Sequence, residues 1–224
     1  MHPSRRALIA SPFLTVAAAA PVDLALVLAV DVSASVDFDE FGLMAGGYAA
    51  AFRDADVIAR ATAGAAGAIA AALLYWAGPG ARDLAVPWAR IEDAASAEDF
   101  AAAIEAAPRI LPAGATALGE ALVAAAALAV RCPFLATRRV IDVSGDGPAN
   151  AGIPAAAGRD AAAALGLTVN ALAIAQDEPD LAEYYAAEVI TGPGAFVLGA
   201  ATYEDFAAAI RRKLLREFGG ALIG

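Results

Sequence analysis

The feature that most constrains the fold is a nearly uninterrupted apolar run at residues 22–30, broken only by Asp23. Aliphatic and β-branched residues in such a run predict a strand that is buried on both faces, as in a parallel sheet covered by helices. Polar side chains begin at Asp31, where the run ends. Because ligands of such sheets bind beyond the carboxyl ends of the strands, we expect a functional loop at this point.

Three oxygen-bearing side chains follow the run at alternating positions, namely Asp31, Ser33 and Ser35. One carboxylate and two hydroxyls on one loop can approach a single point. Such oxygen donors suit the hard cations Mg²⁺, Ca²⁺ and Mn²⁺, whereas Zn²⁺ prefers nitrogen and sulfur. Because three oxygens do not complete an octahedron, further donors must come from other loops at the same edge of the sheet.

Two later segments offer these donors. Thr116 lies in the glycine-containing segment 112–119, which is predicted to be a loop that opens a helix. Asp146 lies in the segment 140–147, just past a second apolar strand. The loops that follow neighbouring parallel strands meet at one sheet edge. The sequence therefore predicts a cation site built from three separate segments.

The order Asp-x-Ser-x-Ser, a loop Thr and then an Asp after the fourth strand resembles the metal-ion-dependent adhesion site of the von Willebrand factor A (vWA) domain family. The resemblance covers roughly residues 22–217, and segments 138–148 and 192–197 look most like an uncharacterised bacterial subgroup. It implies an α/β fold, with a doubly wound, mostly parallel sheet, one antiparallel edge strand and helices on both faces. The metal ligands that it implies are Asp31, Ser33, Ser35, Thr116 and Asp146.

The same resemblance implies a divalent-cation-dependent protein-binding module for adhesion or assembly. Its ion, Mg²⁺ or else Ca²⁺ or Mn²⁺, would accept an Asp or Glu side chain from a protein partner. Two alternatives remain open: a metal-dependent phosphoryl-transfer enzyme on a similar fold, and a vWA-like fold whose five residues are structural only. Phosphoryl transfer usually needs a second acid or base and a phosphate-gripping cation, but the only lysine is Lys213, in the last predicted helix. We therefore expect a protein that is not an enzyme.

Composition narrows the class of partner. With 25 acidic against 15 basic residues the formal net charge is −10, so nucleic acid is not an expected partner, because phosphate binding needs a basic face. The single cysteine, Cys132, cannot form an internal disulfide, and the single histidine, His2, lies at the extreme amino terminus. The length and the 60% hydrophobic content predict one folded domain, at residues 21–224.

Residues 1–20 have the layout of a secretory signal peptide: Arg5-Arg6, an apolar run, and small residues before Pro21. Residues 4–9 also resemble a twin-arginine signal. We therefore expect an exported protein, periplasmic or secreted. The apolar run is shorter than the roughly 20 residues of a spanning helix, so no stable membrane span is expected in the mature chain. An uncleaved membrane anchor is the alternative interpretation.

Several element predictions bear on the site. Helical spacing predicts a helix over 37–54 whose core stripe is Phe41, Met44, Tyr48 and Phe52. The apolar runs 67–76 and 83–88 are too close for a parallel crossover, which predicts antiparallel neighbours. Ser96 is predicted to cap the next helix. A strand over 167–174 and a short last strand over 195–198 are also expected.

Two charged features remain. Asp142 is unexpected inside a central strand, because a buried carboxylate needs a partner or a proton. It could bond to the loops of the site or form a salt bridge with Arg138 or Arg139. The final helix, with inward positions Phe206, Ile210 and Leu214, also carries a basic run that we interpret as a solvated face; its members are Arg211, Arg212, Lys213 and Arg216.

Overall fold

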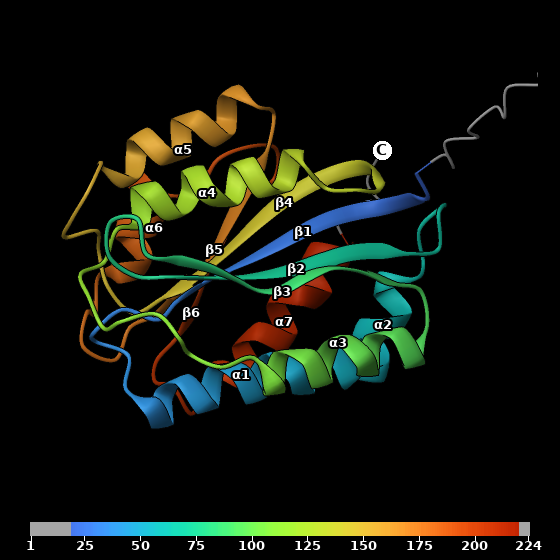
Figure 1. Cartoon of the computed structure of the whole chain (residues 1–224), viewed down its shortest axis with the longest axis horizontal. Coiled ribbons are helices and arrows are strands. Elements are labelled where there is room, and N and C mark those ends of the chain that lie inside the picture. Colours follow the sequence, from blue (N-terminus) through green and yellow to red (C-terminus); the bar gives the residue numbers. More distant parts are fainter. Residues whose placement is uncertain (1–18, 220–224) are drawn as a thin grey trace, which may run out of the picture.

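The computed structural model describes residues 19–219, so the predicted signal peptide lies almost wholly outside the described residues. A central six-stranded sheet separates two layers of helices (Figure 1). In chain order the elements are β1 (Pro21–Asp31), α1 (Phe38–Arg53), α2 (Ala55–Ala61), β2 (Ile69–Trp76), β3 (Arg82–Ile91), α3 (Ala94–Ala106), α4 (Leu118–Val130), β4 (Leu135–Gly145), α5 (Ala155–Ala164), β5 (Thr168–Ile174), α6 (Leu181–Glu188), β6 (Val197–Ala200) and α7 (Phe206–Gly219).

The strand order is β3-β2-β1-β4-β5-β6. All neighbouring pairs are parallel except β2 and β3, which are antiparallel and joined by a short turn at residues 77–81. This arrangement confirms the predicted fold class, including the antiparallel edge strand. The carboxyl ends of the parallel strands all lie on the left side of Figure 1, where the loops of the candidate site gather.

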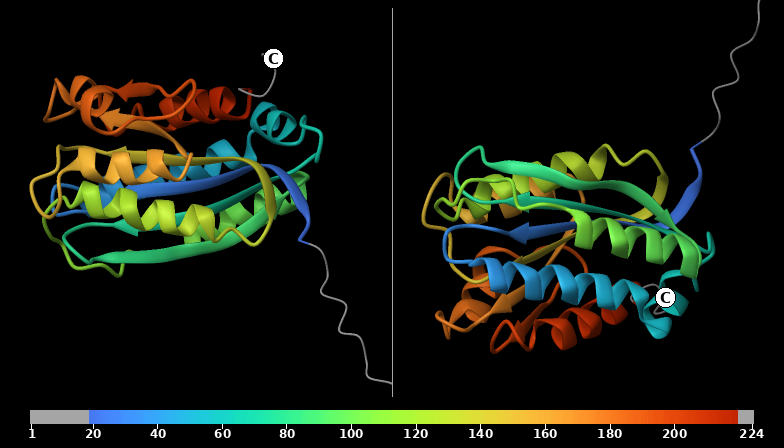
Figure 2. Two further views of the ribbon diagram at one scale, coloured as in Figure 1. Left: turned by 90° about the horizontal axis from the view of Figure 1, so that it is seen from above. Right: turned by 60° about the horizontal axis from the view of Figure 1, so that its bottom comes forward.

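The helices divide between the two faces of the sheet. One face is covered by α1, α2, α3 and α7, of which α3, α1 and α7 lie side by side in the right-hand view of Figure 2; the other face is covered by α4, α5 and α6. Along β1, Leu26 and Leu28 pack in the first core and Val27 and Ala29 pack in the second. This alternation explains why the whole run is apolar, because each face of the strand meets a helical layer.

Local signals explain the start of the first helix. Asp37 caps α1 through a reciprocal capping box. The Asp37 side chain accepts a hydrogen bond from the backbone N–H of Glu40, and the Glu40 side chain accepts one from the backbone N–H of Asp37. Met44, Tyr48 and Phe52 are buried, as predicted, and Phe41 is partly buried. The predicted bounds of this helix are confirmed.

Two local predictions are wrong. The cap of α3 is Asp93 and not Ser96. The Asp93 side chain accepts a hydrogen bond from the backbone N–H of Ser96, and the Ser96 hydroxyl accepts one from the backbone N–H of Asp93. The reciprocal box therefore begins three residues earlier than predicted. The last strand is β6 at Val197–Ala200, two residues later than expected, where it pairs with β5.

The predicted partners of Asp142 are also wrong. Its carboxylate contacts Lys213 of α7, whose Nζ lies 2.5 Å from Oδ1. Lys213 is fully buried, so it does not belong to a solvated basic face, whereas its neighbour Arg211 pairs with Asp54 and Asp56 near the surface. Arg138 instead donates to the carbonyl oxygen of Glu217. Burial of Lys213 follows from its place on the side of α7 that faces the sheet.

Within residues 19–219, none of the helices is both long and apolar enough to cross a membrane.

Candidate metal site

The five predicted ligands come from three loops at the carboxyl edge of the sheet. Asp31 is the last residue of β1, and Ser33 and Ser35 follow it in the loop before α1. Thr116 lies just before α4, and Asp146 follows the last residue of β4. Because β1 and β4 are parallel neighbours, their final residues end side by side.

The structure brings these side chains into one hydrogen-bonded group. Thr116 Oγ1 donates to Ser33 Oγ at 3.3 Å, and the hydroxyls of Ser33 and Ser35 lie 3.3 Å apart. Ser35 Oγ donates to Asp146 Oδ1 at 2.9 Å. The chain of oxygens thus runs from the loop before α4 to the end of β4. Four of the five predicted residues are joined directly by their side chains.

Asp31, the fifth residue, is fully buried. Its Oδ1 accepts a hydrogen bond from the backbone N–H of Ser33 at 2.8 Å, but its Oδ2 has no hydrogen-bond partner in the described part of the chain. Burial, and next the charge of Asp146, raise the pKa of Asp31 to about 7. A buried carboxylate oxygen without a partner is costly, so this site favours either a proton or a cation.

Backbone bonds hold the loops against one another. The N–H of Ala34 donates to the carbonyl oxygen of Gly114 at 2.9 Å, and the N–H of Ala117 donates to that of Ala77 at 3.0 Å. The N–H of Thr116 donates to Asn150 Oδ1 at 2.8 Å, and the N–H of Asn150 donates back to the Thr116 carbonyl at 3.0 Å. Three hydrogen bonds therefore hold the backbone at Thr116 and Ala117, which helps to preorganise the site.

Three further residues, which the sequence patterns did not reveal, support the site. Tyr203, in the connection from β6 to α7, donates to Asp146 Oδ2 at 2.9 Å. Arg109 donates to the carbonyl oxygens of Val32 and Ser33 at 3.0 and 2.9 Å. Tyr185 of α6 donates to the carbonyl oxygen of Gly147 at 3.3 Å. Each comes from a segment distant in sequence and from no recognisable motif, so only the tertiary fold identifies it.

Gly145 makes room for the buried aspartate. A Cβ atom at this position would lie 2.6 Å from the Tyr185 hydroxyl and 3.1 Å from Asp31 Oδ2. The last residue of β4 must therefore lack a side chain for Asp31 to occupy its place beside the strand.

The donor set fits a hard divalent cation. It offers two carboxylates and three hydroxyls, all of them oxygen, and one carboxylate oxygen lacks a partner. No group of three or more His, Cys, Asp or Glu side chains that could hold a metal ion is found within the described range, so the candidate site depends on its three hydroxyl groups as well. The ligands Asp31, Ser33, Ser35, Thr116 and Asp146 together could hold such a cation through oxygen atoms alone.

Similar solved structures define the class of fold. The vWF domain of the type V pili tip protein Mfa5 from Porphyromonas gingivalis matches with a TM-score of 0.63 and 12% identity, over 91% of this chain and 97% of that one. A von Willebrand factor type A protein from Catenulispora acidiphila matches with a TM-score of 0.61 and 20% identity, over 88% of this chain and 43% of that one. Proximal thread matrix protein 1 from the mussel byssus, with a zinc-occupied MIDAS motif, matches with a TM-score of 0.64 and 17% identity, over 89% and 48%.

These likenesses, with the strand order, assign the chain to the vWA-like α/β fold. The chain spans less than half the length of the Catenulispora and mussel proteins. Residues 21–222 match the model of the family described as "Protein of unknown function (DUF1194)", so the chain belongs to that family. No curated protein matches the chain in sequence.

Proposed function

We propose that the protein is a divalent-cation-dependent protein-binding module. Asp31, Ser33, Ser35, Thr116 and Asp146 would hold Mg²⁺, or Ca²⁺ or Mn²⁺, and the ion would accept an Asp or Glu side chain from a protein partner. The observation that carries this proposal is the fully buried Asp31, whose Oδ2 has no hydrogen-bond partner within residues 19–219 although four other oxygen-bearing side chains gather beside it.

The charges of the site favour a divalent cation. Asp31 and Asp146 repel one another, which is one reason why the pKa of Asp31 is raised, and an ion of charge +2 would offset both carboxylates. The remaining donors are neutral hydroxyls, so the protein supplies no further negative charge. A bound ion would then remain attractive to the carboxylate of a partner.

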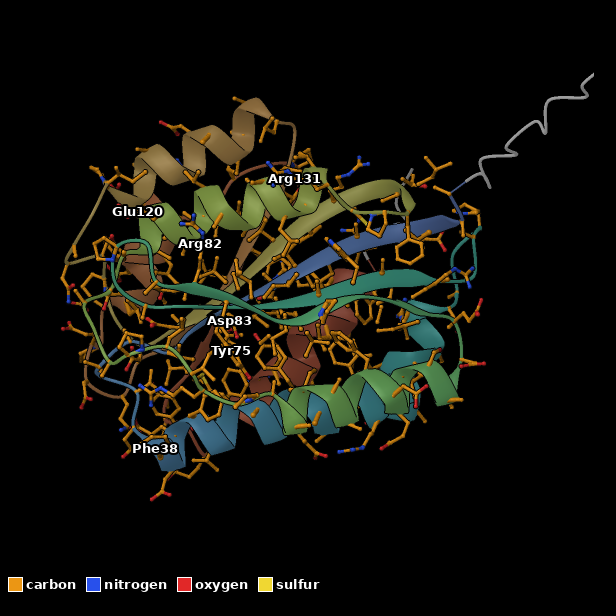
Figure 3. The ribbon with its side chains drawn as sticks, in the orientation of Figure 1. Phe38, Tyr75, Arg82, Asp83, Glu120 and Arg131 are labelled. Atoms are coloured by element: carbon orange, nitrogen blue, oxygen red, sulfur yellow. The ribbon has the colours of Figure 1, made fainter. Side chains whose placement is uncertain are left out.

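A protein partner fits the surface beside the site. Phe38, the first residue of α1, is 78% exposed and lies at the periphery of the molecule (Figure 3). The guanidinium of Arg109, which contacts the Asp31–Ser33 loop, lies 5.4 Å from the centroid of the Phe38 ring. Exposed aromatic and arginine side chains are enriched at protein interfaces. The exposed Phe38 ring, backed by the partly buried Arg109, would offer a partner an apolar contact beside the ion.

The similar structures support the same kind of function. One is a domain of a pilus tip protein, and another carries a metal-occupied MIDAS motif. With the signal-like residues 1–20, the pilus likeness supports an exported protein that acts in the periplasm or outside the cell.

The phosphoryl-transfer alternative lacks its phosphate-gripping lysine. Lys213, the one lysine of the sequence, is fully buried against Asp142 and Glu217 and does not face the candidate metal site. No specific observation favours an enzyme, so we propose none.

Binding of a carboxylate to the protein-bound ion tests the proposal. Mn²⁺ is paramagnetic, so a carboxylate that coordinates protein-bound Mn²⁺ has its proton relaxation enhanced. With acetate as the probe, we expect strong enhancement with the wild-type protein and loss of the enhancement in Thr116→Ala. Enhancement no larger than that of the Thr116→Ala sample would overturn the proposal. The exposed substitution Val123→Ala, on α4 but outside the ligand set, is the matched control and should behave as wild type.

A further inference from the structure

A second polar cluster lies in the interior, away from the candidate metal site. It comprises Asp142 of β4, Asn170 of β5, and Lys213 and Glu217 of α7, each no more than 2% exposed. Asp142 and Asn170 are register partners on neighbouring strands, and α7 covers them. None of these residues contacts the five candidate ligands, so the metal site does not explain their presence.

The amine of Lys213 makes two close contacts in this cluster. Its Nζ lies 2.5 Å from Asp142 Oδ1 and 3.1 Å from Glu217 Oε1. The first distance is shorter than the about 2.7–2.9 Å of an ordinary charged hydrogen bond. Even so, neither oxygen of Asp142 has a hydrogen-bond partner of acceptable geometry among the residues described. The amine nevertheless lies in close salt-bridge contact with the carboxyl group.

The surroundings disfavour charge. Two carboxylates and one ammonium would leave a net negative charge in an interior where the ring of Phe196 lies 5.3 Å from Lys213 Nζ. Burial raises the pKa of Asp142 to about 7 in spite of the nearby ammonium, and Glu217 raises it further. Transfer of one proton from the Lys213 ammonium to Asp142 would remove two of the buried charges. The uncharged amine is a nucleophile, and the carboxylic acid is its possible acceptor.

We propose that Lys213 and Asp142 form an intramolecular amide bond that ties α7 covalently to β4, with Glu217 as the proton carrier. The Lys213 nitrogen attacks Asp142 Cγ, and Glu217 accepts the proton that leaves the nitrogen. Glu217 then returns this proton to the departing hydroxyl, the carbon–oxygen bond breaks, and one water molecule is released. An amine and a carboxylic acid thus give an amide and water, with no oxidant, reductant or further reactant.

The fold positions the three groups for this reaction. Asn170 Nδ2 donates to Glu217 Oε1 at 2.8 Å, and its Oδ1 accepts from the backbone N–H of Phe196 at 2.9 Å, which fixes the side chain of Asn170. Arg138 donates to the carbonyl oxygen of Glu217 and holds that end of α7. Contact distance between amine and carboxyl replaces the encounter of two separate molecules, and the buried site keeps water from reversing the step.

Peptide mapping of the denatured full-length chain tests the proposal. Trypsin would release Asp142 in residues 140–159. It cuts after an unmodified Lys213 and releases residues 214–216, but it does not cut after a Lys213 whose amine is in an amide, which stays in residues 213–216. We expect a branched product in which residues 140–159 and 213–216 are joined and which is lighter than the sum of these two peptides by the mass of one water. Recovery of residues 140–159 and 214–216 as separate linear peptides, in full yield from a folded protein, would overturn the proposal.

Two variants assign the roles. Lys213→Met removes the nucleophile and must abolish the branched peptide. Glu217→Gln keeps the size of the side chain and an oxygen that can accept from Asn170, but it cannot carry the proton, so the linear peptides should predominate in a protein that circular dichroism shows to be folded. A Glu217→Gln protein as fully joined as wild type would refute the role of Glu217. If Lys213→Met does not fold, the wild-type peptide map still decides whether the bond exists.

Discussion

The hydroxyl of Tyr203 donates a 2.9 Å hydrogen bond to Oδ2 of Asp146, so the connection between β6 and α7 contacts the candidate metal site directly. Oδ1 of the same carboxylate accepts from Ser35. Both oxygens of Asp146 are therefore oriented by hydroxyl groups from other segments. A ligand carboxylate held in this way is already oriented before a cation binds.

Tyr203→Phe removes this orienting hydroxyl. We expect it to weaken divalent-cation binding by about tenfold, the lower end of the effect usual for residues that orient metal ligands. Isothermal titration with Mg²⁺ or Mn²⁺ measures the change. Tyr75→Phe is the matched control, because the Tyr75 hydroxyl has no hydrogen-bond partner in the described structure and its loss should leave affinity unchanged. Equal affinities of Tyr203→Phe and wild type would show that the bond does not support the site.

The raised pKa of Asp31 predicts a pH dependence with a defined sign. Burial raises this pKa from 3.8 to about 7, so between these pH values the folded protein holds a proton that the unfolded chain has lost. The free energy of unfolding of the cation-free protein should therefore fall as the pH rises from about 4 to about 7. Asp31→Asn should lack this contribution, which urea unfolding at several pH values measures.

Cation binding should show the opposite trend. A cation binds the ionised form of Asp31 and must displace its proton. The cation affinity should therefore increase as the pH is raised towards 7, by up to about tenfold per pH unit, and level off above 7. Calorimetric titration with Mg²⁺ on either side of pH 7 measures this. An affinity that does not change with pH would mean that Asp31 is already ionised in the cation-free protein.

Gly145→Ala should damage the site. The added Cβ would meet the Tyr185 hydroxyl at 2.6 Å and Asp31 Oδ2 at 3.1 Å, so β4 or its neighbours must shift. We expect a loss of stability of about 1–3 kcal/mol, as for other overpacked interiors, and loss of cation binding. Gly147→Ala is the control in the same loop, because nothing lies within 4 Å of its added Cβ. Wild-type behaviour of Gly145→Ala would contradict the close packing of Asp31 on β4.

Arg109→Met should loosen the loop that carries Ser33 and Ser35. It removes two hydrogen bonds to backbone carbonyl oxygens, each of about 1 kcal/mol, and a positive charge that favours the ionised form of Asp31. Weaker cation binding is expected, together with a higher pKa of Asp31. Arg131→Met is a suitable control, since Arg131 is exposed at the far end of α4 (Figure 3). Equal cation affinities of both variants would exclude a role of Arg109 in the site.

The fold, and the gathering of the five candidate ligands at one edge of the sheet, could be predicted from the sequence because both depend on local patterns. The run at 22–30 is apolar on both faces, and Asp31 and Asp146 directly follow apolar strands. Because β1 and β4 are parallel neighbours, their ends lie together, and this can be predicted without information on side-chain packing. The turn between β2 and β3 is short enough to force antiparallel pairing.

The partners of Asp142 could not be predicted in the same way. Arg138 lies on the same face of β4, but four residues along a strand span about 13 Å, too far for a direct pair. The actual partner, Lys213, is distant in sequence and reaches Asp142 only because α7 packs on that face. Tyr203 and Arg109 were missed for the same reason, since their roles depend on how distant segments pack and not on a periodic pattern.

Thermal unfolding with EDTA, Mg²⁺, Ca²⁺ or Mn²⁺ tests the central claim most directly, with the wild-type protein beside Asp31→Ala and Thr116→Ala. A cation that binds only the folded state raises the unfolding temperature. We predict that at least one of the three cations raises the unfolding temperature of wild type above its value in EDTA and leaves both variants unchanged. The same unfolding temperature for wild type in all four conditions would contradict a metal site, and the five residues would then have structural roles only.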